Sequence, residues 1–124
     1  MYIVKKSLSF SAAHALRDYE GPCARVHGHN YRVEVEVWGA EVAANQLLVD
    51  FYDLDARLQP LVDRLDHQLI NEIPPFTEVN PTAEALAAWF FHELARNWPE
   101  KAPYTLKGVH IWETEDSCAS FVNS

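Results

Sequence analysis

The chain has 124 residues, of which 48% are hydrophobic and 23% are charged, and its formal net charge is −8. This length suits one globular domain, residues 1–124, with one hydrophobic core, and the composition argues against a disordered chain. The acidic balance argues against a nucleic-acid backbone as the main partner, although a few local cations in a pocket can still bind a small anion.

No apolar stretch is long enough to suggest a transmembrane helix, and the first residues do not read as a signal peptide. Cys23 and Cys118 are the only cysteines, fewer than a disulfide-stapled secreted domain usually carries. We therefore expect a cytoplasmic protein with reduced thiols and no membrane partner.

The first part of the chain predicts two strands. Alternate residues of Tyr2–Ala13 are mostly hydrophobic, and His14 continues this face. A loop over Ala15–Arg25 leads to a clearer strand, His27–Trp38. There His27 and His29 share a face with the hydrophobic residues, while charged residues alternate with them.

A helix is predicted from Phe51, with Asp50 as its N-cap. Its hydrophobic residues follow helical spacing: Phe51, Leu54, Leu58, Leu61 and Leu65. Pro60 lies inside this run, so we expect a kink or an early end there.

A second helix is predicted from Pro81 or Thr82 to Asn97, with Asn80 or Thr82 as its cap. Two strands follow, over Thr105–Thr114 and Cys118–Val122. This order of elements predicts an α+β fold in which both helices pack on one face of a four-stranded antiparallel sheet.

The strongest local signal for chemistry is the pair His27 and His29, with Gly28 between them. Residues two apart in a strand point the same way and lie about 7 Å apart, so two imidazoles can reach one metal ion. His14 is the natural third ligand, because a neighbouring antiparallel strand would bring it alongside. Three imidazoles favour zinc, although a His-x-His pair on a strand is also common without any metal.

Cys23 has three roles open to it. The thiol could be a fourth ligand that closes a structural zinc site, which would suit a non-catalytic binding module. It could instead be a thiolate base beside the metal, or an inert buried cysteine.

Asp66 and His67 follow the first helix, and a carboxylate can prepare an imidazole for proton transfer. Neighbouring residues do not readily join their side chains, and an isolated Asp-His pair is more often structural than catalytic. Glu113 ends the third strand, where its carboxylate could accept two parallel hydrogen bonds from a guanidine-like ligand edge or simply be solvated.

Six short motifs together resemble the family of 6-pyruvoyl-tetrahydropterin and 6-carboxytetrahydropterin synthases. They lie in family order along nearly the whole chain: Phe10-Ser-Ala-Ala-His14, Cys23-x-x-x-His27-Gly-His29, Val49-Asp50-Phe51, Leu65-Asp66-His67, Asn80-Pro-Thr-Ala-Glu84 and Trp112-Glu113. Each motif is weak alone, but all of them in register are specific.

The resemblance implies a role for each of these residues. The zinc ligands would be His14, His27 and His29. The catalytic residues would be Cys23, Asp66 and His67. Glu113 would anchor the pterin, and Thr82 would lie near it. The fold would be the tunnelling fold, in which subunits join their sheets into a barrel, commonly as a hexamer made of two trimers.

The resemblance also implies a reaction. The spacing of Cys23 and His27 and the short loop Ala15–Pro22 are similar to the bacterial 6-carboxytetrahydropterin synthases of queuosine-precursor synthesis. Such an enzyme is a lyase that converts 7,8-dihydroneopterin triphosphate to 6-carboxy-5,6,7,8-tetrahydropterin, acetaldehyde and triphosphate. The alternative on the same scaffold is the 6-pyruvoyl-forming enzyme. Six cations are available for the triphosphate: Lys5, Lys6, Arg17, Arg25, Arg32 and Lys107.

Overall fold

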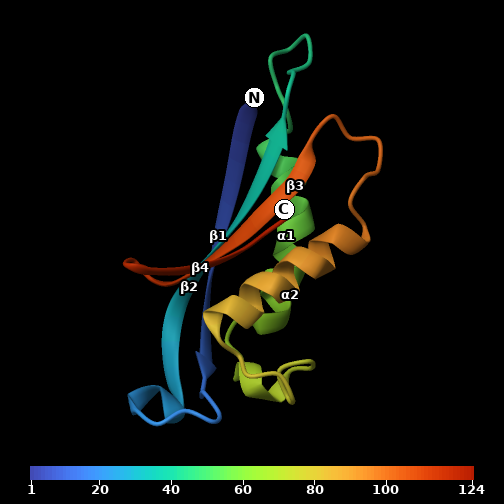
Figure 1. Ribbon diagram of the computed structural model, residues 1–124. Coiled ribbons are helices and arrows are strands. Elements are labelled where there is room, and N and C mark those ends of the chain that lie inside the picture. The colour runs from blue at the N-terminus through green and yellow to red at the C-terminus, as the bar shows by residue number, and fades with distance from the viewer.

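The computed structural model describes residues 1–124 as a four-stranded antiparallel sheet with two helices on one face (Figure 1). The elements in chain order are β1 (Tyr2–His14), the 3-10 helix η1 (Pro22–Ala24), β2 (His27–Gly39), α1 (Phe51–Leu65), the 3-10 helix η2 (Ile70–Glu72), α2 (Ala83–Arg96), β3 (Thr105–Thr114) and β4 (Ser117–Val122). The predicted α+β fold and its order of elements are confirmed.

The strands form a simple meander with the order β1-β2-β3-β4. Along β1 and β2 the register runs from Tyr2 opposite Gly39 to His14 opposite His27. The alternation predicted for β2 is present, because Tyr31, Val33 and the two valines that follow are buried, while the residues between them lie on the open face of the sheet. This register places the two predicted metal-binding segments side by side.

Helix α1 lies on the sheet through one hydrophobic stripe. The stripe consists of Leu54, Leu58, Val62 and Leu65, all buried. Asp50 caps the helix by accepting a hydrogen bond from the N–H of Tyr52. The helix runs through Pro60 to Leu65, so the early end expected at this proline is wrong. Pro60 is exposed, and the buried residues on both sides of it hold the helix against the sheet.

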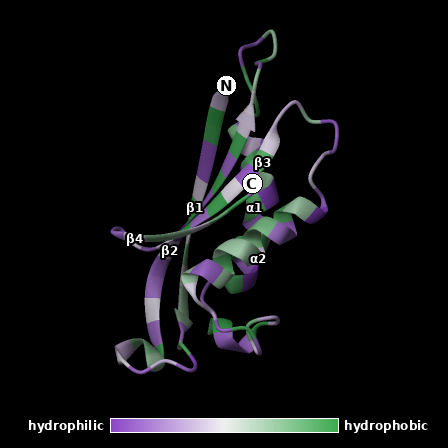
Figure 2. Ribbon diagram, viewed as in Figure 1, coloured by the Kyte–Doolittle hydropathy of each residue, from purple (hydrophilic) through white to green (hydrophobic).

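Helix α2 begins after Thr82, whose hydroxyl accepts the N–H of Ala85. Thr82 is therefore the cap among the two candidates. The helix buries a larger hydrophobic side than α1 does, with Leu86, Phe90 and Leu94 packed into the core. Figure 2 shows hydrophobic and hydrophilic segments alternating along both helices, as expected for helices with one face on a sheet.

The outer edge of β1 is partly covered by the segment that follows α1. The N–H of His67 donates to the carbonyl of Ser11, and the N–H of Ala13 donates to the carbonyl of Gln68. Leu69 forms a parallel bridge with Ala13. This segment satisfies backbone groups that an edge strand would otherwise expose. None of the helices has the length and hydrophobicity needed to cross a membrane.

Candidate metal and active site

Three histidines meet where β1 ends and β2 begins. The candidate ligand atoms of His14, His27 and His29 all lie within 4.8 Å of one another. His14 is buried, with 1% of its surface exposed, and the other two are half-buried. The strand register explains this meeting, because His14 pairs with His27 and Ala12 pairs with His29.

Two of these rings are held by backbone carbonyl groups. Nδ1–H of His14 donates to the carbonyl of Pro81 at 2.7 Å, and Nδ1–H of His27 donates to that of Arg25 at 2.7 Å. A carbonyl oxygen can only accept, so the proton sits on Nδ1 and the lone pair on Nε2 in each neutral ring. Metal-binding histidines usually have this kind of support.

The two Nε2 atoms of His14 and His27 face each other at 3.0 Å. Two lone pairs at this distance repel unless a proton or a metal ion lies between them. Nitrogen ligands at about 2.0–2.1 Å from a tetrahedral zinc ion are roughly 3.3 Å apart, close to the observed spacing. The donor set of three imidazoles therefore fits a zinc ion.

His29 completes the cluster from β2. Its Nε2 is buried and has no hydrogen-bond partner, although Oε1 of Glu113 lies 3.3 Å away. Burial lowers the pKa of His29, the charges of His14 and His27 lower it further, and the carboxylate of Glu113 opposes them. The ring is thereby favoured in its neutral, metal-binding form.

Tyr31 lies beneath the histidines and is a site residue that we did not predict from the sequence. Its ring meets those of His14 and His29 edge to face, with centroids 5.8 Å and 5.3 Å apart. Its hydroxyl is buried without a hydrogen-bond partner. Burial and the nearby Glu113 raise its pKa, so the phenol stays protonated. Because side chains alternate along β2, Tyr31 lies two residues after His29 and on the same face, and this alternation is the sequence signal that could have found it.

Glu113 extends the inner face of β3 toward this cluster, where its side chain is 25% exposed. It lies beside His29 rather than in open solvent. A carboxylate in this position can accept hydrogen bonds from a ligand held over the histidines.

Asp66 and His67 form a side-chain pair of their own. Nδ1 of His67 lies 3.0 Å from Oδ2 of Asp66, so the expectation that these neighbours do not readily join is wrong. His67 has a φ of 58°, which turns its ring back toward the preceding residue. Hydrogen bonds from the N–H of Ser11 and from His67 lower the pKa of Asp66.

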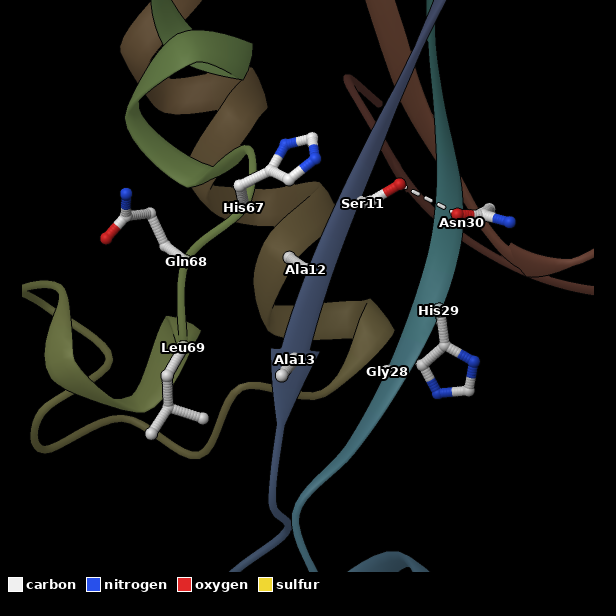
Figure 3. A pocket seen from close by; sticks show the side chains of 9 residues that line it. All are labelled: Ser11, Ala12, Ala13, Gly28, His29, Asn30, His67, Gln68 and Leu69. Carbon is white, nitrogen blue, oxygen red and sulfur yellow. Dashed lines mark hydrogen bonds between the residues drawn. The ribbon is translucent and has the colours of Figure 1, made fainter.

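This pair lies apart from the histidine cluster in the same chain. Figure 3 shows His67 beyond β1 and His29 on the far side of β2, with both strands between them in this view. A cavity of about 490 Å³ lies here, lined on the strands by small residues such as Ala13 and Gly28. His67 and His29 are both among the residues that line it.

Cys23 lies in η1, in the loop between β1 and β2, and is half-buried with a free thiol. Its thiol makes no hydrogen bond and does not join the group of possible metal ligands. Within one chain, the structure thus does not support Cys23 as a fourth ligand. Nor does it bring Cys23 into contact with Asp66 or His67.

Comparisons with known proteins agree with this geometry. A sequence model described as 6-pyruvoyl tetrahydropterin synthase matches residues 3–124. The chain belongs to this family. The predicted family and the prediction of a lyase are thereby confirmed.

Individual relatives span most of the chain. The 6-carboxy-5,6,7,8-tetrahydropterin synthase of Synechocystis is 38% identical, covering 97% of this chain and 90% of the relative. A putative 6-carboxy-5,6,7,8-tetrahydropterin synthase of Archaeoglobus fulgidus is 39% identical, covering 94% and 92%. The structure of Caenorhabditis elegans 6-pyruvoyl tetrahydropterin synthase superposes with a TM-score of 0.86 at 26% identity, covering 99% and 96%. The predicted tunnelling fold is confirmed by this likeness.

Proposed function

We propose that the protein converts 7,8-dihydroneopterin triphosphate to 6-carboxy-5,6,7,8-tetrahydropterin, with release of acetaldehyde and triphosphate. The observation that carries this proposal is the cluster of His14, His27 and His29, with two rings oriented by backbone carbonyls and their Nε2 atoms facing each other. Relatives at 38% and 39% identity bear the name of this activity.

The three histidines would hold a catalytic zinc ion. Zinc bound there would polarise oxygen atoms of the substrate side chain and acidify the neighbouring C–H and O–H protons. The lowered pKa of His29 suits this role, because it favours the neutral ring that can bind a metal ion, and the buried ring of Tyr31 packs against His14 and His29.

The protein's own side chains would bind the substrate and move its protons. Glu113, next to His29, would accept hydrogen bonds from the pterin ring, and Thr82 would lie near the ring. Cys23 would remove a proton as a thiolate, and His67, oriented by Asp66, would remove or return another. His67 keeps an uncommon left-handed backbone, a kind of strain that collects at functional sites.

Assembly would bring these groups together. Cys23 and His67 make no contact within one chain, and the sheet keeps one uncovered edge at β4. An open edge favours pairing with another chain. We therefore propose a homo-oligomer with a barrel of joined sheets, built as a hexamer of two trimers, in which a neighbouring subunit completes each site.

We choose between the 6-carboxy and the 6-pyruvoyl product from the spacing of Cys23 and His27. Three residues separate Cys23 from His27, and the preceding loop is short. Both features favour the 6-carboxy product over the 6-pyruvoyl product. The enzyme would then act in the cytoplasm in the synthesis of queuosine and related 7-deazapurines.

One experiment tests this function. The zinc-loaded protein is incubated with 7,8-dihydroneopterin triphosphate, and the pterin and acetaldehyde are identified by mass spectrometry. We expect 6-carboxytetrahydropterin and an equal amount of acetaldehyde. A 6-pyruvoyl product would support the alternative enzyme, and no conversion with zinc bound would refute both.

A further inference from the structure

The substrate of the proposed function carries a triphosphate, yet the chain has a net charge of −8. A binding site for this group needs local cations. Six of the ten lysines and arginines lie in β1, β2, β3 or the loop between β1 and β2, and we rank these six by the contacts of each side chain. The inference below rests on the proposed function for the identity of the ligand.

Arg17 and Lys107 are engaged by backbone carbonyl groups. The guanidinium of Arg17 donates to the carbonyls of Val79, Asn71 and Phe76 at 3.2, 3.4 and 2.8 Å, and so holds the connection between the helices. Nζ of Lys107 donates to the carbonyl of Asn123 at 2.6 Å. Releasing either cation for a ligand would break contacts within the fold.

Lys5 and Arg32 lie on the open face of the sheet beside acidic residues. Nζ of Lys5 is 3.8 Å from Glu36. Arg32 stacks on the ring of Trp112 at 4.8 Å and faces Glu34 at 4.0 Å. Neighbouring carboxylates make both positions poor sites for a polyanion.

Lys6 makes no ion pair, but it lies far from the histidines. It pairs with Val35, whereas His14 pairs with His27, so eight residues of β1 separate Lys6 from the cluster. Eight residues of a strand span about 26 Å. A substrate whose side chain reaches the histidines would not extend to Lys6 of the same chain.

Arg25 is the remaining cation, and it lies beside the cluster. Its carbonyl accepts Nδ1–H of His27 at 2.7 Å, and its N–H donates to the carbonyl of Pro22 at 3.2 Å. The backbone of Arg25 is thus tied both to a metal ligand and to the turn that carries Cys23. Its side chain is exposed and makes no ion pair, hydrogen bond or ring contact.

We propose that the guanidinium of Arg25 binds the triphosphate group of the substrate. A guanidinium presents a rigid fork of N–H donors that matches two phosphate oxygens, and a bond to a charged phosphate is stronger than a neutral hydrogen bond. In this position Arg25 selects the phosphorylated pterin over the same pterin without phosphate.

Calorimetric titration tests this role. Zinc-loaded protein with Cys23→Ala, which stops turnover, is titrated with 7,8-dihydroneopterin triphosphate and with 7,8-dihydroneopterin. Adding Arg25→Ala should weaken binding of the triphosphate form by about tenfold or more and leave binding of the other form unchanged. Arg25→Lys should restore part of the affinity, and Lys6→Ala, the matched control, should change neither.

Two results would overturn the proposal. One is an equal effect of Arg25→Ala on both ligands, or no effect on either. The other is a changed sedimentation coefficient for Arg25→Ala, which would make Arg25 an assembly contact. Because binding is measured without turnover, a different product would refute the proposed reaction while leaving a phosphate-specific loss at Arg25 intact.

Discussion

At the scale of single residues, the site depends on where two protons lie. The carbonyls of Pro81 and Arg25 fix Nδ1–H in His14 and His27, which turns both Nε2 lone pairs inward. The parity of β2 was enough to predict that His27 and His29 share a face. The orienting carbonyls could not be predicted, because every residue carries one and only the fold decides which one a ring meets.

The proposed role of Cys23 as a general base can be tested by substitution. Cys23→Ala should keep zinc and lower kcat by about 10²- to 10⁴-fold, since a general base is removed and no ligand is lost. Turnover and zinc content are measured together, with Cys118→Ala on the exposed strand β4 as the control. Loss of zinc from Cys23→Ala would mean that Cys23 is a ligand in the assembled protein and that its role as base is wrong.

At the scale of elements, the sequence pattern did not predict the course of the segment that follows α1. Asp66 and His67 leave the helix and run along the edge of β1, where Ser11 holds both: its N–H donates to the Asp66 carboxylate, and its carbonyl accepts the N–H of His67. Helical spacing stops at Leu65 and carries no information about this edge. His67 also adopts a left-handed backbone, with a φ of 58°, which the helical spacing does not predict.

Thr82 lies where helix α2 begins, next to the residue whose carbonyl group orients His14. Its hydroxyl caps α2, and the preceding carbonyl of Pro81 holds His14. Thr82→Ala should lower the free energy of unfolding by about 0.5–2 kcal/mol through loss of the cap. Urea unfolding checks this, with Thr82→Ser as the control that keeps a hydroxyl. An unchanged unfolding free energy in Thr82→Ala would show that the cap contributes nothing.

Glu36 links the strands on the open face of the sheet. It accepts a hydrogen bond from Nε2 of His110 at 2.8 Å and another from the indole of Trp38, and Lys5 lies nearby. Burial alone would raise the pKa of Glu36, but these hydrogen bonds and charges outweigh it and leave the pKa below its ordinary value.

A lowered carboxyl pKa stabilises the fold above the pKa of the unfolded chain, about 4.3 for glutamate. This stability is lost as the pH falls from there through the lower pKa of the folded state. Glu36→Gln should therefore be less stable at neutral pH and lose less stability on acidification than the wild type. Urea unfolding at pH 7 and at several values below 4.3 measures both effects. Glu115→Gln, in the exposed turn, is the control, and parallel acid limbs for Glu36→Gln and wild type would contradict the prediction.

At the scale of the whole molecule, the sheet and helices share one hydrophobic core that does not include the three histidines. The histidines lie at one end, and the core is built from hydrophobic residues along the whole length of both helices. Metal removal should therefore abolish activity and leave the far-UV circular dichroism spectrum unchanged, with activity restored by added zinc. Unfolding by a chelator would mean a structural zinc site instead.

Much of this fold follows from the pattern of residues. Alternation in β2 and helical spacing before Leu65 predicted the layers, and the family motifs suggested which residues to propose for the site. The early end expected at Pro60 was wrong, because packing on both sides outweighs the missing hydrogen bond. The alternation of β2 places Tyr31 on the face of the histidines, but its ring contacts with His14 and His29 depend on the tertiary fold. The assembly of chains likewise depends on the shape and chemistry of their surfaces, which the periodicity of the sequence does not describe.

We propose that His14, His27 and His29 together hold one catalytic zinc ion. The most direct measurement is the zinc content per chain of the reconstituted wild type and of the three single alanine variants, with the exposed His92→Ala as the control. We predict about one zinc per chain in the wild type and in His92→Ala, and a strong loss in each of the other three. A wild type that binds no zinc, or three variants that all retain it, would contradict this account.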